Sequence, residues 1–353
     1  MRIKFDDCCR SLTGDEATFP TGGISPLVVD VGVIGKKSEL TTWLAEQRSE
    51  VQARLLQHGA ILFRGATNIQ NVADFQEVAR ALEPELASSH PFDDGPRGWR
   101  SEHVWDAGAH VVGTPRARQM LPFHNEDSYL PVLPRRLLFC SLRAPSLGGE
   151  TSLTDCRRVL ADIPRSTLAK VMGRHYRVRT VLPVELVMQN ARLRTAAEAE
   201  AFARARSGAE IAVEGEHLVF TSSCPAVVVH PQTGERLWVN RLRTRKLTGH
   251  FFDQFLGSLN ARGVLRLRAL ARTAAALLKP RTAWLVLKGL LGLEPHPEGL
   301  SASDEWHIAR AYWKNSVLIR WQNGDFLVVD NLLMAHGRMP FQGDRDIVGA
   351  LVS

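Results

Sequence analysis

The chain has 353 residues, 44% of them apolar and 23% charged, a composition typical of a globular protein that excludes a largely disordered chain. The net charge of +7 comes from Lys and Arg residues that are interleaved with acidic residues through most of the sequence, which argues against nucleic-acid binding. Five cysteines do not form the pattern of a disulfide framework, and no run of about 20 apolar residues could span a membrane, so the sequence predicts a cytoplasmic protein without a transmembrane segment.

The first elements in chain order are an N-terminal extension and a helix, strand, helix unit. Residues 1–24 lack the apolar core of a signal peptide, and we expect them to precede one elaborated domain that covers residues 25–353. Apolar spacing predicts the elements of the unit: a helix from Leu40 to Gln57, a buried strand at 60–63 and an amphipathic helix from Ile69 to Leu82.

An irregular segment follows between Pro84 and Pro122. Its prolines, glycines and aspartates predict a loop. Three histidines in it are possible metal ligands by residue type: His90, His103 and His110. None of them has a carboxylate at strand or helix spacing together with a partner strand, so solvated loop histidines are the simpler interpretation.

A His-x-Glu pair then occurs at His124 and Glu126. On an extended strand, residues two apart point to the same side, so both side chains can converge on one ion while Asn125 faces away. The best second histidine is His336, because the apolar run Phe326–Val329 before it predicts a buried strand that delivers it to the end of a sheet. Two imidazoles and one carboxylate on one face of a metal leave its other positions open, as in non-haem Fe(II) oxygenases.

Two arginines, Arg338 and Arg345, follow the second histidine and precede an expected strand at 347–352. Guanidinium groups bind carboxylates bidentately, so this region could hold the carboxylate of a cosubstrate. A zinc hydrolase can use the same ligand types, but it leaves Arg345 without a role. A non-catalytic interaction protein with the same fold is the other alternative, and the intact ligand set argues against it.

Short apolar runs separated by turn residues dominate the remaining chain, which predicts a mainly β (α+β) sandwich or barrel with peripheral helices. The expected strands are 135–142, 150–154, 218–221, 226–230, 236–239 and 316–321, and the expected helices are 164–172 and 195–206. A turn at 322–325 is expected to connect to the strand that carries His336.

Residues 251–293 break the strand pattern with two apolar, basic segments that Pro280 separates. Seven cations surround apolar positions at helical spacing: Arg262, Arg266, Arg268, Arg272, Lys279, Arg281 and Lys288. One interpretation is that these helices cover the barrel and that their charges are solvated. Another is that the basic face docks an acidic carrier protein that presents a tethered amino acid; a membrane surface or a second copy in a homo-oligomer are further alternatives.

Four ordered motifs, at 123–129, 148–151, 230–235 and 330–338, resemble the TauD/TfdA family of Fe(II)- and 2-oxoglutarate-dependent oxygenases, and within it the syringomycin-pathway amino-acid hydroxylase branch. The resemblance covers roughly residues 27–353. It implies a double-stranded β-helix, or jelly-roll, core with a helical insertion at about residues 251–300. The branch usually has Asn-Gln followed by an aromatic residue and His where this chain has Asn240, Arg241 and Arg243, which leaves the substrate open.

The resemblance also implies roles for individual residues. His124, Glu126 and His336 are expected to bind Fe(II), Arg345 to pair with the C5 carboxylate of 2-oxoglutarate, and Thr151 to add a hydroxyl donor. With O2 as the other cosubstrate, such an enzyme hydroxylates an unactivated aliphatic carbon and releases succinate and CO2. Glu126 argues against halogenation, because halogenating relatives have a small residue at that position.

The implied substrate is an amino acid, free or carrier-tethered, in the biosynthesis of a specialised metabolite such as an antibiotic. A catabolic dioxygenase, or a desaturase or cyclase acting on another small carboxylate, is the alternative. Substrate contacts are expected from the loop before His124 and from Asn125 and Ser128. Arg64 and Arg338 are further candidates, although a structural salt bridge explains each of them equally well.

Overall fold

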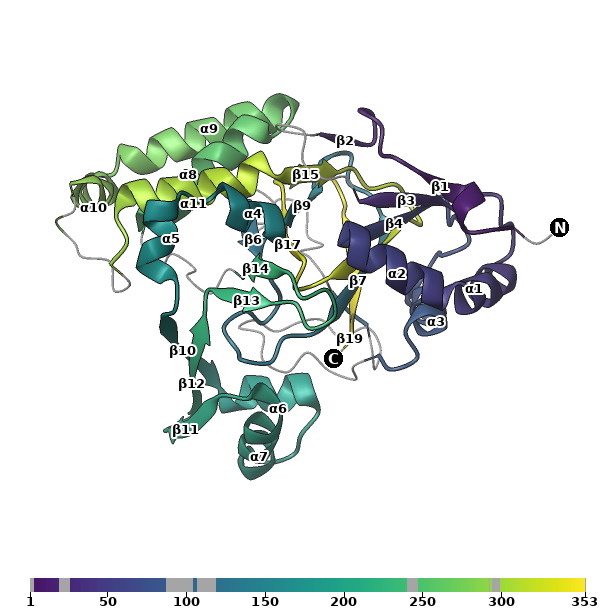
Figure 1. Ribbon diagram of the computed structural model, residues 1–353, viewed down its shortest axis with the longest axis horizontal. Helices are drawn as coiled ribbons and strands as arrows, with labels where there is room; N and C mark the ends of the chain where they lie inside the picture. Colours follow the sequence, from purple (N-terminus) through teal and green to yellow (C-terminus); the bar gives the residue numbers. More distant parts are fainter. Residues whose placement is uncertain are drawn as a thin grey trace.

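Two β-sheets form the centre of the molecule, and helices lie around them (Figure 1). The computed structural model describes residues 3–18, 26–86, 104–106, 119–239, 247–291, 293 and 299–352; His90, His103, His110, Asn240, Arg241 and Arg243 lie outside these ranges. The larger sheet contains, in spatial order, β1 (Cys9–Arg10), β3 (Leu27–Asp30), β4 (Ala60–Arg64), β16 (Phe326–Asp330), β7 (Arg136–Arg143), β19 (Asp346–Val352) and β5 (Trp105–Asp106). The smaller sheet contains β2 (Ala17–Thr18), β15 (Ser316–Ile319), β9 (Thr151–Asp155), β17 (Met334–Arg338) and β6 (Leu121–His124).

The two sheets share one hydrophobic core. Phe139 of β7 in the larger sheet contacts His336 of β17 in the smaller one, with 5.3 Å between the ring centroids. Strands β4 and β16 are buried along their whole length, which explains why they occur in the sequence as continuous apolar runs without alternation. The predicted mainly β core with peripheral helices is therefore confirmed.

The N-terminal segment contributes a strand to each sheet. β1 pairs with β3 at the edge of the larger sheet, and β2 pairs with β15 at the edge of the smaller one. Between these strands, the Glu16 carboxylate accepts two hydrogen bonds of 2.7 Å from Arg10 and lies 2.8 Å from Nη1 of the buried Arg64. Arg64 also pairs with Asp325 at 3.0 Å. This network of charges fastens the N-terminal segment to the core.

Helices α1 (Lys37–Glu46), α2 (Arg48–His58) and α3 (Val72–Leu82) lie on the side of the molecule that β1 and β3 occupy (Figure 1). The prediction of one continuous helix from Leu40 to Gln57 is wrong, because the backbone leaves helical geometry at Gln47 (φ −92°, ψ 4°) and separates α1 from α2. The predicted amphipathic helix before Pro84 is confirmed as α3. Its N-cap is Asn71, whose side chain accepts a hydrogen bond from the backbone N–H of Asp74.

Residues 175–225 form a unit that protrudes from the two sheets (Figure 1). The unit contains β10 (His175–Pro183), α6 (Val184–Ala191), α7 (Ala196–Ser207), β11 (Glu210–Glu214) and β12 (His217–Pro225). The strand predicted at 218–221 lies within β12, but it does not join the barrel as expected, since β12 pairs with β10 and β11 in a sheet of its own. One face of this sheet packs with α6 and α7 in a second hydrophobic cluster that includes Leu182, Val187 and Phe220.

A short hairpin of β13 (Val227–Val229) and β14 (Arg236–Trp238) follows. His230 begins its turn, where Nδ1 accepts hydrogen bonds from the backbone N–H groups of Gln232 and Thr233. Nε2 of the same ring lies 3.3 Å from Oδ2 of Asp330, the last residue of β16. The motif at 230–235 therefore anchors the hairpin to the larger sheet.

Four helices cover the side opposite α1–α3: α8 (Leu247–Asn260), α9 (Gly263–Leu277), α10 (Pro280–Leu290) and α11 (Ala302–Lys314) (Figure 1). The predicted separation at Pro280 is confirmed, and the proline occupies the first position of α10, where a helix needs no backbone N–H. Phe123 of β6 packs against Tyr312 and Trp313 of α11, with centroid distances of 5.6 and 5.0 Å. This layer therefore covers the outer face of the strand that carries His124.

The remaining elements are the 3-10 helix η1 (Asp6–Cys8), helices α4 (Cys156–Asp162) and α5 (Arg165–Val171), and the paired strands β8 (Leu147–Gly148) and β18 (Phe341–Gln342). All five cysteines are free thiols. Among the helices of the described residues, none has the length and the apolar character needed to cross a membrane.

Candidate metal and cosubstrate site

Three adjacent strands of the smaller sheet, β6, β17 and β9, build the site. In their register His336 lies opposite His124 on one side and Leu153 on the other, and Arg338 lies opposite Thr151. The expectation that His336 ends the strand at 326–329 is wrong: that strand is β16 of the larger sheet, and the turn at 322–325 leads into it. The chain then crosses between the sheets through residues 331–333, and His336 lies in the middle of its own strand.

The structure brings His124, Glu126 and His336 together, with one ligand atom of each within 4.8 Å of the others. Oε2 of Glu126 is 3.8 Å from Nε2 of His124 and 3.5 Å from Nε2 of His336. Two imidazole nitrogens and one carboxylate oxygen at these separations can close on one first-row metal ion, which forms bonds of about 2.0–2.2 Å to such atoms. Glu126 and His336 are buried, and His124 is half-buried.

The two ligands of the His-x-Glu pair converge through a turn and not along a strand. β6 ends at His124, and Asp127 has a positive φ of 54°. Hydrogen bonds from Ser128 N to Asn125 O and from Leu130 N to Asp127 O close this turn. The expected placement of Glu126 by strand alternation is therefore wrong, and it is the turn that puts this residue beside the histidines.

Asn331 holds the backbone of Glu126, a relationship that the sequence did not reveal. The Asn331 side chain accepts a hydrogen bond of 2.8 Å from Glu126 N and donates one of 3.0 Å to Glu126 O. In return, Nδ2 of Asn125 donates to the backbone oxygens of Asn331 and Met334, at 2.7 and 3.3 Å. Asn125 was expected to face away from the ion and to contact substrate; its amide instead fastens the ligand-bearing turn to the segment that leads to His336.

The ring of His124 has a defined orientation. Its Nδ1 lies 2.9 Å from the carbonyl oxygen of Pro122, an acceptor, so Nδ1 carries the proton and Nε2 keeps its lone pair toward Glu126. Nδ1 of His336 is buried and has no hydrogen-bond partner among the described residues. The donor set and the orientation of these rings fit a metal site.

Thr151 is buried, and its Oγ1 accepts a hydrogen bond of 3.0 Å from the indole Nε1 of Trp321. An indole N–H can only donate, so the hydroxyl proton of Thr151 remains available to a second acceptor. Trp321 was missed at the level of sequence, because an aromatic residue after an apolar strand gives no signal beyond a contribution to the core.

Arg345 is a buried cation, and its Nη1 has no hydrogen-bond partner among the described residues. Nε donates a long hydrogen bond of 3.4 Å to the carbonyl of Gly149. Burial, followed by the positive charge of Arg338, lowers the pKa of Arg345 to about 9. A guanidinium in such surroundings is stabilised by an anion, as expected for a residue that binds a carboxylate.

Arg338 and Arg345 both lie against Phe341, with guanidinium carbons 5.2 and 5.6 Å from the ring centroid. Nη2 of Arg338 also donates to the carbonyl of Gln119 at 3.3 Å. Of the other expected substrate contacts, Ser128 is buried in the turn after Glu126. Arg64 lies in the ion-pair network with Glu16 and Asp325 described above, which gives it a structural role.

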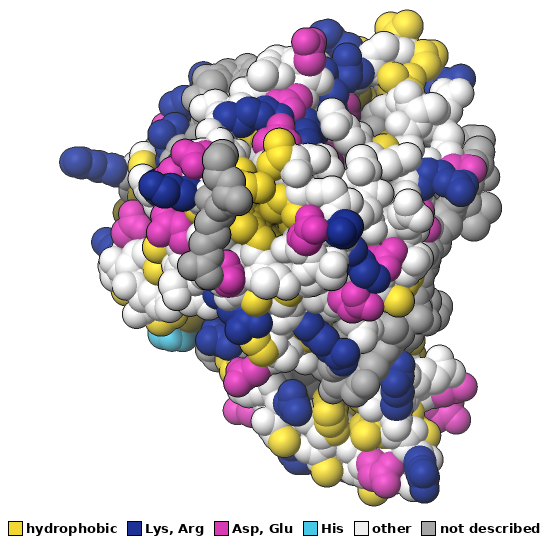
Figure 2. All heavy atoms as spheres, turned by 90° about the vertical axis from the view of Figure 1, so that its right-hand side faces the viewer, with side chains coloured by type: hydrophobic (Ala, Val, Ile, Leu, Met, Phe, Trp, Pro, Cys, Tyr) yellow, Lys and Arg dark blue, Asp and Glu magenta, His cyan; other side chains and the backbone are white. Residues whose placement is uncertain are grey.

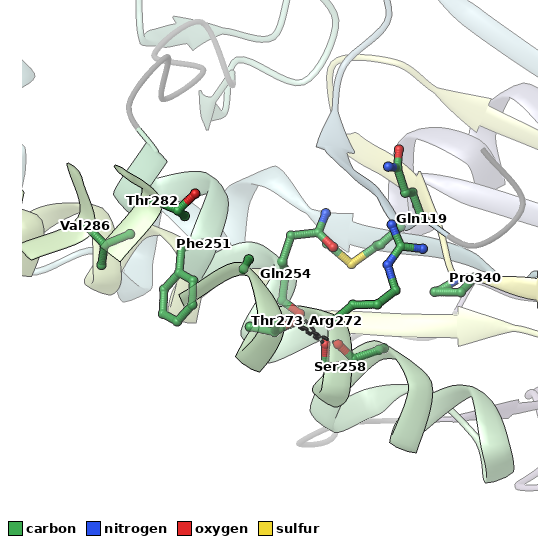
Figure 3. A pocket seen from close by; sticks show the side chains of 13 residues that line it. Gln119, Phe251, Gln254, Ser258, Arg272, Thr273, Thr282, Val286 and Pro340 are labelled. Carbon is green, nitrogen blue, oxygen red and sulfur yellow. Dashed lines mark hydrogen bonds between the residues drawn. The ribbon is translucent and has the colours of Figure 1, made fainter. Parts of the chain in front are cut away.

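A cavity of about 250 Å³ lies between α8, α9, α10 and the chain before β6. Gln119 and Pro340, which line one side, flank the two strands that carry the site. Figure 3 shows the Arg272 side chain of α9 extending toward Gln119, and the hydrogen bond between Ser258 and Thr273 that joins α8 to α9. The lining of this cavity combines amide, hydroxyl and guanidinium groups with apolar side chains.

Comparisons with known proteins agree with this geometry. The model of the "Taurine catabolism dioxygenase TauD, TfdA family" matches residues 24–351. The chain is 26% identical over 303 residues to the dapdiamide synthesis protein DdaC of Enterobacter agglomerans, covering 84% of this chain and 83% of DdaC.

Two solved structures share the fold. One is a putative alpha-ketoglutarate-dependent taurine dioxygenase from Burkholderia xenovorans, with 17% identity, a TM-score of 0.51 and coverage of 96% of this chain and 88% of that one. The other is PvcB, described as an Fe, alpha-ketoglutarate dependent oxygenase from an isonitrile synthetic pathway, with 13% identity, a TM-score of 0.53 and coverage of 100% and 94%. The predicted jelly-roll fold is thereby confirmed.

Proposed function

Because this chain belongs to the TauD, TfdA family of dioxygenases, we propose that it uses Fe(II), 2-oxoglutarate and O2 to hydroxylate an aliphatic carbon of an amino-acid-like substrate in a biosynthetic pathway. The observation that carries the proposal is the meeting of His124, Glu126 and His336 in a fold that also buries the guanidinium of Arg345. When bound, Fe(II) and 2-oxoglutarate supply the oxidation of a C–H bond by O2, with release of succinate and CO2.

In this proposal the protein prepares the metal ligands before the ion arrives. Pro122 holds the proton on Nδ1 of His124 and so leaves Nε2 free to bind the ion. Asn331 fixes the backbone of Glu126 on both sides and limits the positions that its carboxylate can reach. Three protein ligands leave the other coordination positions to small molecules.

Arg345 and Thr151 would hold the far end of 2-oxoglutarate. Along β17 and β9, the pair Arg338 and Thr151 lies two residues beyond the pair His336 and Leu153. Two residues along a strand span about 7 Å, a distance that suits a five-carbon diacid bound to the metal at one end. The hydroxyl proton of Thr151 and the unpartnered Nη1 of Arg345 would then both meet the C5 carboxylate.

The substrate class rests on the relatives. DdaC is named for dapdiamide synthesis, and PvcB for an isonitrile synthetic pathway, so both names favour biosynthesis over catabolism. An amino-acid-like substrate would bring a carboxylate, for which Arg338 offers a second cation near the site. The proposal covers a free substrate, whose carboxylate Arg338 could pair with, and a carrier-tethered one, whose carboxyl group is bound to the carrier.

The experiment uses protein purified without O2 and loaded with Fe(II), followed by 2-oxoglutarate, O2 labelled with oxygen-18, and a panel of amino acids, free and carrier-bound. Succinate release that one substrate stimulates, with labelled oxygen in the product, supports hydroxylation. Stimulated succinate release without label in the product would instead indicate a desaturase or cyclase. Hydrolysis by the zinc-loaded protein, with no succinate from the iron-loaded protein, would contradict the proposal.

A further inference from the structure

Helix α9 has an apolar face that points outward. Five residues at steps of three and four are exposed on it and form what we call the apolar stripe: Val264, Leu267, Ala271, Ala274 and Leu278, the last being the C-cap residue. The exposed fractions of Leu267 and Leu278 are 70% and 83%. A helix that covers a protein core normally turns its polar face to water. Here the inward face is occupied as well, since Leu265 is buried and Thr273 lines the cavity.

Apolar exposure continues into α10 and the residues after it. Trp284, Leu287, Leu290, Leu291 and Leu293 are all exposed. Most of the large apolar side chains that are exposed in the described part of the chain lie in this region, between Leu259 and Leu293. A concentration of this kind marks a surface that another molecule covers.

The same region carries the positive charge of the protein. Residues 262–293 contain seven Lys and Arg residues and no acidic residue, which equals the net charge of the whole chain. At 3.6 residues per turn, Arg268 and Lys279 fall along one edge of the apolar stripe, and both are exposed, whereas Arg272 lines the cavity on the inner side of α9. On the α1–α3 side of the molecule, by contrast, cationic and acidic side chains are interspersed (Figure 2).

The charges beside the apolar stripe indicate which kind of molecule covers it. A second copy of this chain would bring the same exposed cations of α9, among them Arg268 and Lys279, against each other in a symmetric contact, and like charges oppose such an association. A folded protein partner needs roughly one hydrogen bond for each 100–200 Å² of interface, and on this surface only the Arg and Lys residues beside the apolar stripe could donate them. Acyl chains require no hydrogen bonds, and anionic headgroups complement a row of Arg and Lys.

We infer that the apolar stripe of α9 and the exposed end of α10 insert into the surface of an anionic lipid bilayer, with the cationic edge of α9 on the headgroups. Aliphatic and Trp side chains beside Lys and Arg are the composition of helices that lie in the plane of a membrane interface. The protein is then a peripheral membrane protein, and α9 separates the cavity between α8 and α10 from the lipid.

The test measures sedimentation of the full chain with vesicles of phosphatidylcholine alone and of phosphatidylcholine mixed with phosphatidylglycerol. Binding is expected to the mixed vesicles and not to the neutral ones. It is expected to weaken at 1 M salt, where the Debye length falls to about 3 Å. The double variant Leu267→Gln, Leu278→Gln should reduce partition into mixed vesicles on the order of tenfold to a hundredfold, because each exposed leucine loses its transfer into the acyl layer.

Matched substitutions elsewhere keep the test specific. Val132→Gln with Val229→Gln changes two side chains that are 59% and 62% exposed outside the α9–α10 region, and it should leave vesicle binding unchanged. Arg268→Gln with Lys279→Gln should weaken binding to mixed vesicles while the protein remains folded by circular dichroism.

Each remaining outcome overturns the inference. Absence of vesicle binding would do so directly. Binding that the α9 substitutions leave unchanged would place the lipid contact on another surface. A dimer in sedimentation velocity that Leu267→Gln with Leu278→Gln dissociates, without vesicle binding, would show that a second copy covers the apolar stripe.

Discussion

His124 and His336 stand opposite each other in the register of β6 and β17, and their ring centroids are 4.2 Å apart. The hydrogen-bonded ladder therefore fixes the separation of the two imidazoles whether or not an ion is bound. Glu126 reaches the same point from a turn, and two hydrogen bonds between the Asn331 side chain and the backbone of Glu126 hold that turn in place.

Removal of any one ligand is expected to abolish 2-oxoglutarate turnover and to leave the fold largely intact. The variants are His124→Ala, Glu126→Ala and His336→Ala, and the measurements are iron content, succinate release and circular dichroism. His175→Ala changes an exposed histidine of β10 and serves as the control. Near-normal turnover in one of the three variants would remove that residue from the ligand set.

Asn331→Ala is expected to lower metal affinity by about tenfold to a hundredfold, because residues that orient metal ligands contribute on this scale. The comparison is Asn315→Ala, which also removes a buried amide that is hydrogen-bonded, in that case to Asp162 and Ala311. Both variants should lose stability, but only Asn331→Ala should release iron more readily in a chelator competition. Equal metal affinities would show that Asn331 supports the fold alone.

Arg345→Leu is expected to raise the 2-oxoglutarate concentration for half-maximal turnover by tenfold to over a hundredfold, since a buried charge-assisted hydrogen bond contributes about 1.5–3 kcal/mol. Arg338→Leu should have a smaller effect on 2-oxoglutarate, and Arg143→Leu, at an exposed ion pair with Asp344, almost none. An unchanged 2-oxoglutarate requirement in Arg345→Leu would contradict the assignment.

The pH dependence of cosubstrate binding follows from the pKa of Arg345, which lies near 9 in the free protein. The guanidinium is charged below that pKa, so 2-oxoglutarate affinity is expected to fall as the pH rises above about 9. The charge of Arg338 contributes to the lowered pKa, so Arg338→Leu should move this fall to higher pH. Affinity titrations by calorimetry between pH 7 and 10.5 would test both expectations; a fall at the same pH in Arg338→Leu and the parent would refute the second.

Thr151→Val is expected to reduce the free energy of unfolding by about 1–3 kcal/mol, because it leaves the buried indole N–H of Trp321 without an acceptor. It should also weaken 2-oxoglutarate binding, whereas Thr151→Ser should largely restore both properties. Thr154→Val on the same strand removes a buried hydrogen bond to the Tyr312 carbonyl and should affect stability alone. If both valine variants bind 2-oxoglutarate like the parent, Thr151 is a structural residue.

Arg64→Leu is expected to destabilise the protein by about 3–5 kcal/mol in urea unfolding, because it leaves the carboxylates of Glu16 and Asp325 without their buried partner. At the exposed pair of Arg143 and Asp344, the same substitution should cost about 0–1 kcal/mol. A loss of substrate affinity in Arg64→Leu with unchanged stability would restore Arg64 as a substrate contact.

The metal-ligand candidates could be selected from the sequence because residue type restricts them more than geometry does. Strand alternation predicted that the side chains of His124 and Glu126 point to one side. In the structure a turn brings them together instead. Asn331 and Trp321 could not be found in this way, since their partners Glu126 and Thr151 are 205 and 170 positions distant in the chain. Only the folded pairing of strands makes these residues neighbours.

The order of strands was equally beyond the sequence. The apolar pattern correctly predicted strands at the positions of β12 and β16. It could not show which sheet each strand joins, because a strand of the main sheets and a strand of a separate unit have the same alternation and burial. The membership of β12 depends on Leu182, Val187 and Phe220 packing in their own cluster. Likewise, no periodicity in the sequence indicates that residues 331–333 carry the chain from β16 in the larger sheet to β17 in the smaller one.

The two strands of the N-terminal segment have a consequence for how the protein is made. β2 is translated some 300 positions before its pairing partner Ile319, as the contact between Thr18 and Arg320 across 302 positions illustrates. Until then β2 has no partner strand in the smaller sheet, and Arg64, which pairs with Glu16 of the segment, lacks its second partner Asp325. The smaller sheet, and with it the metal site, can close only after β15 and β17 have been translated.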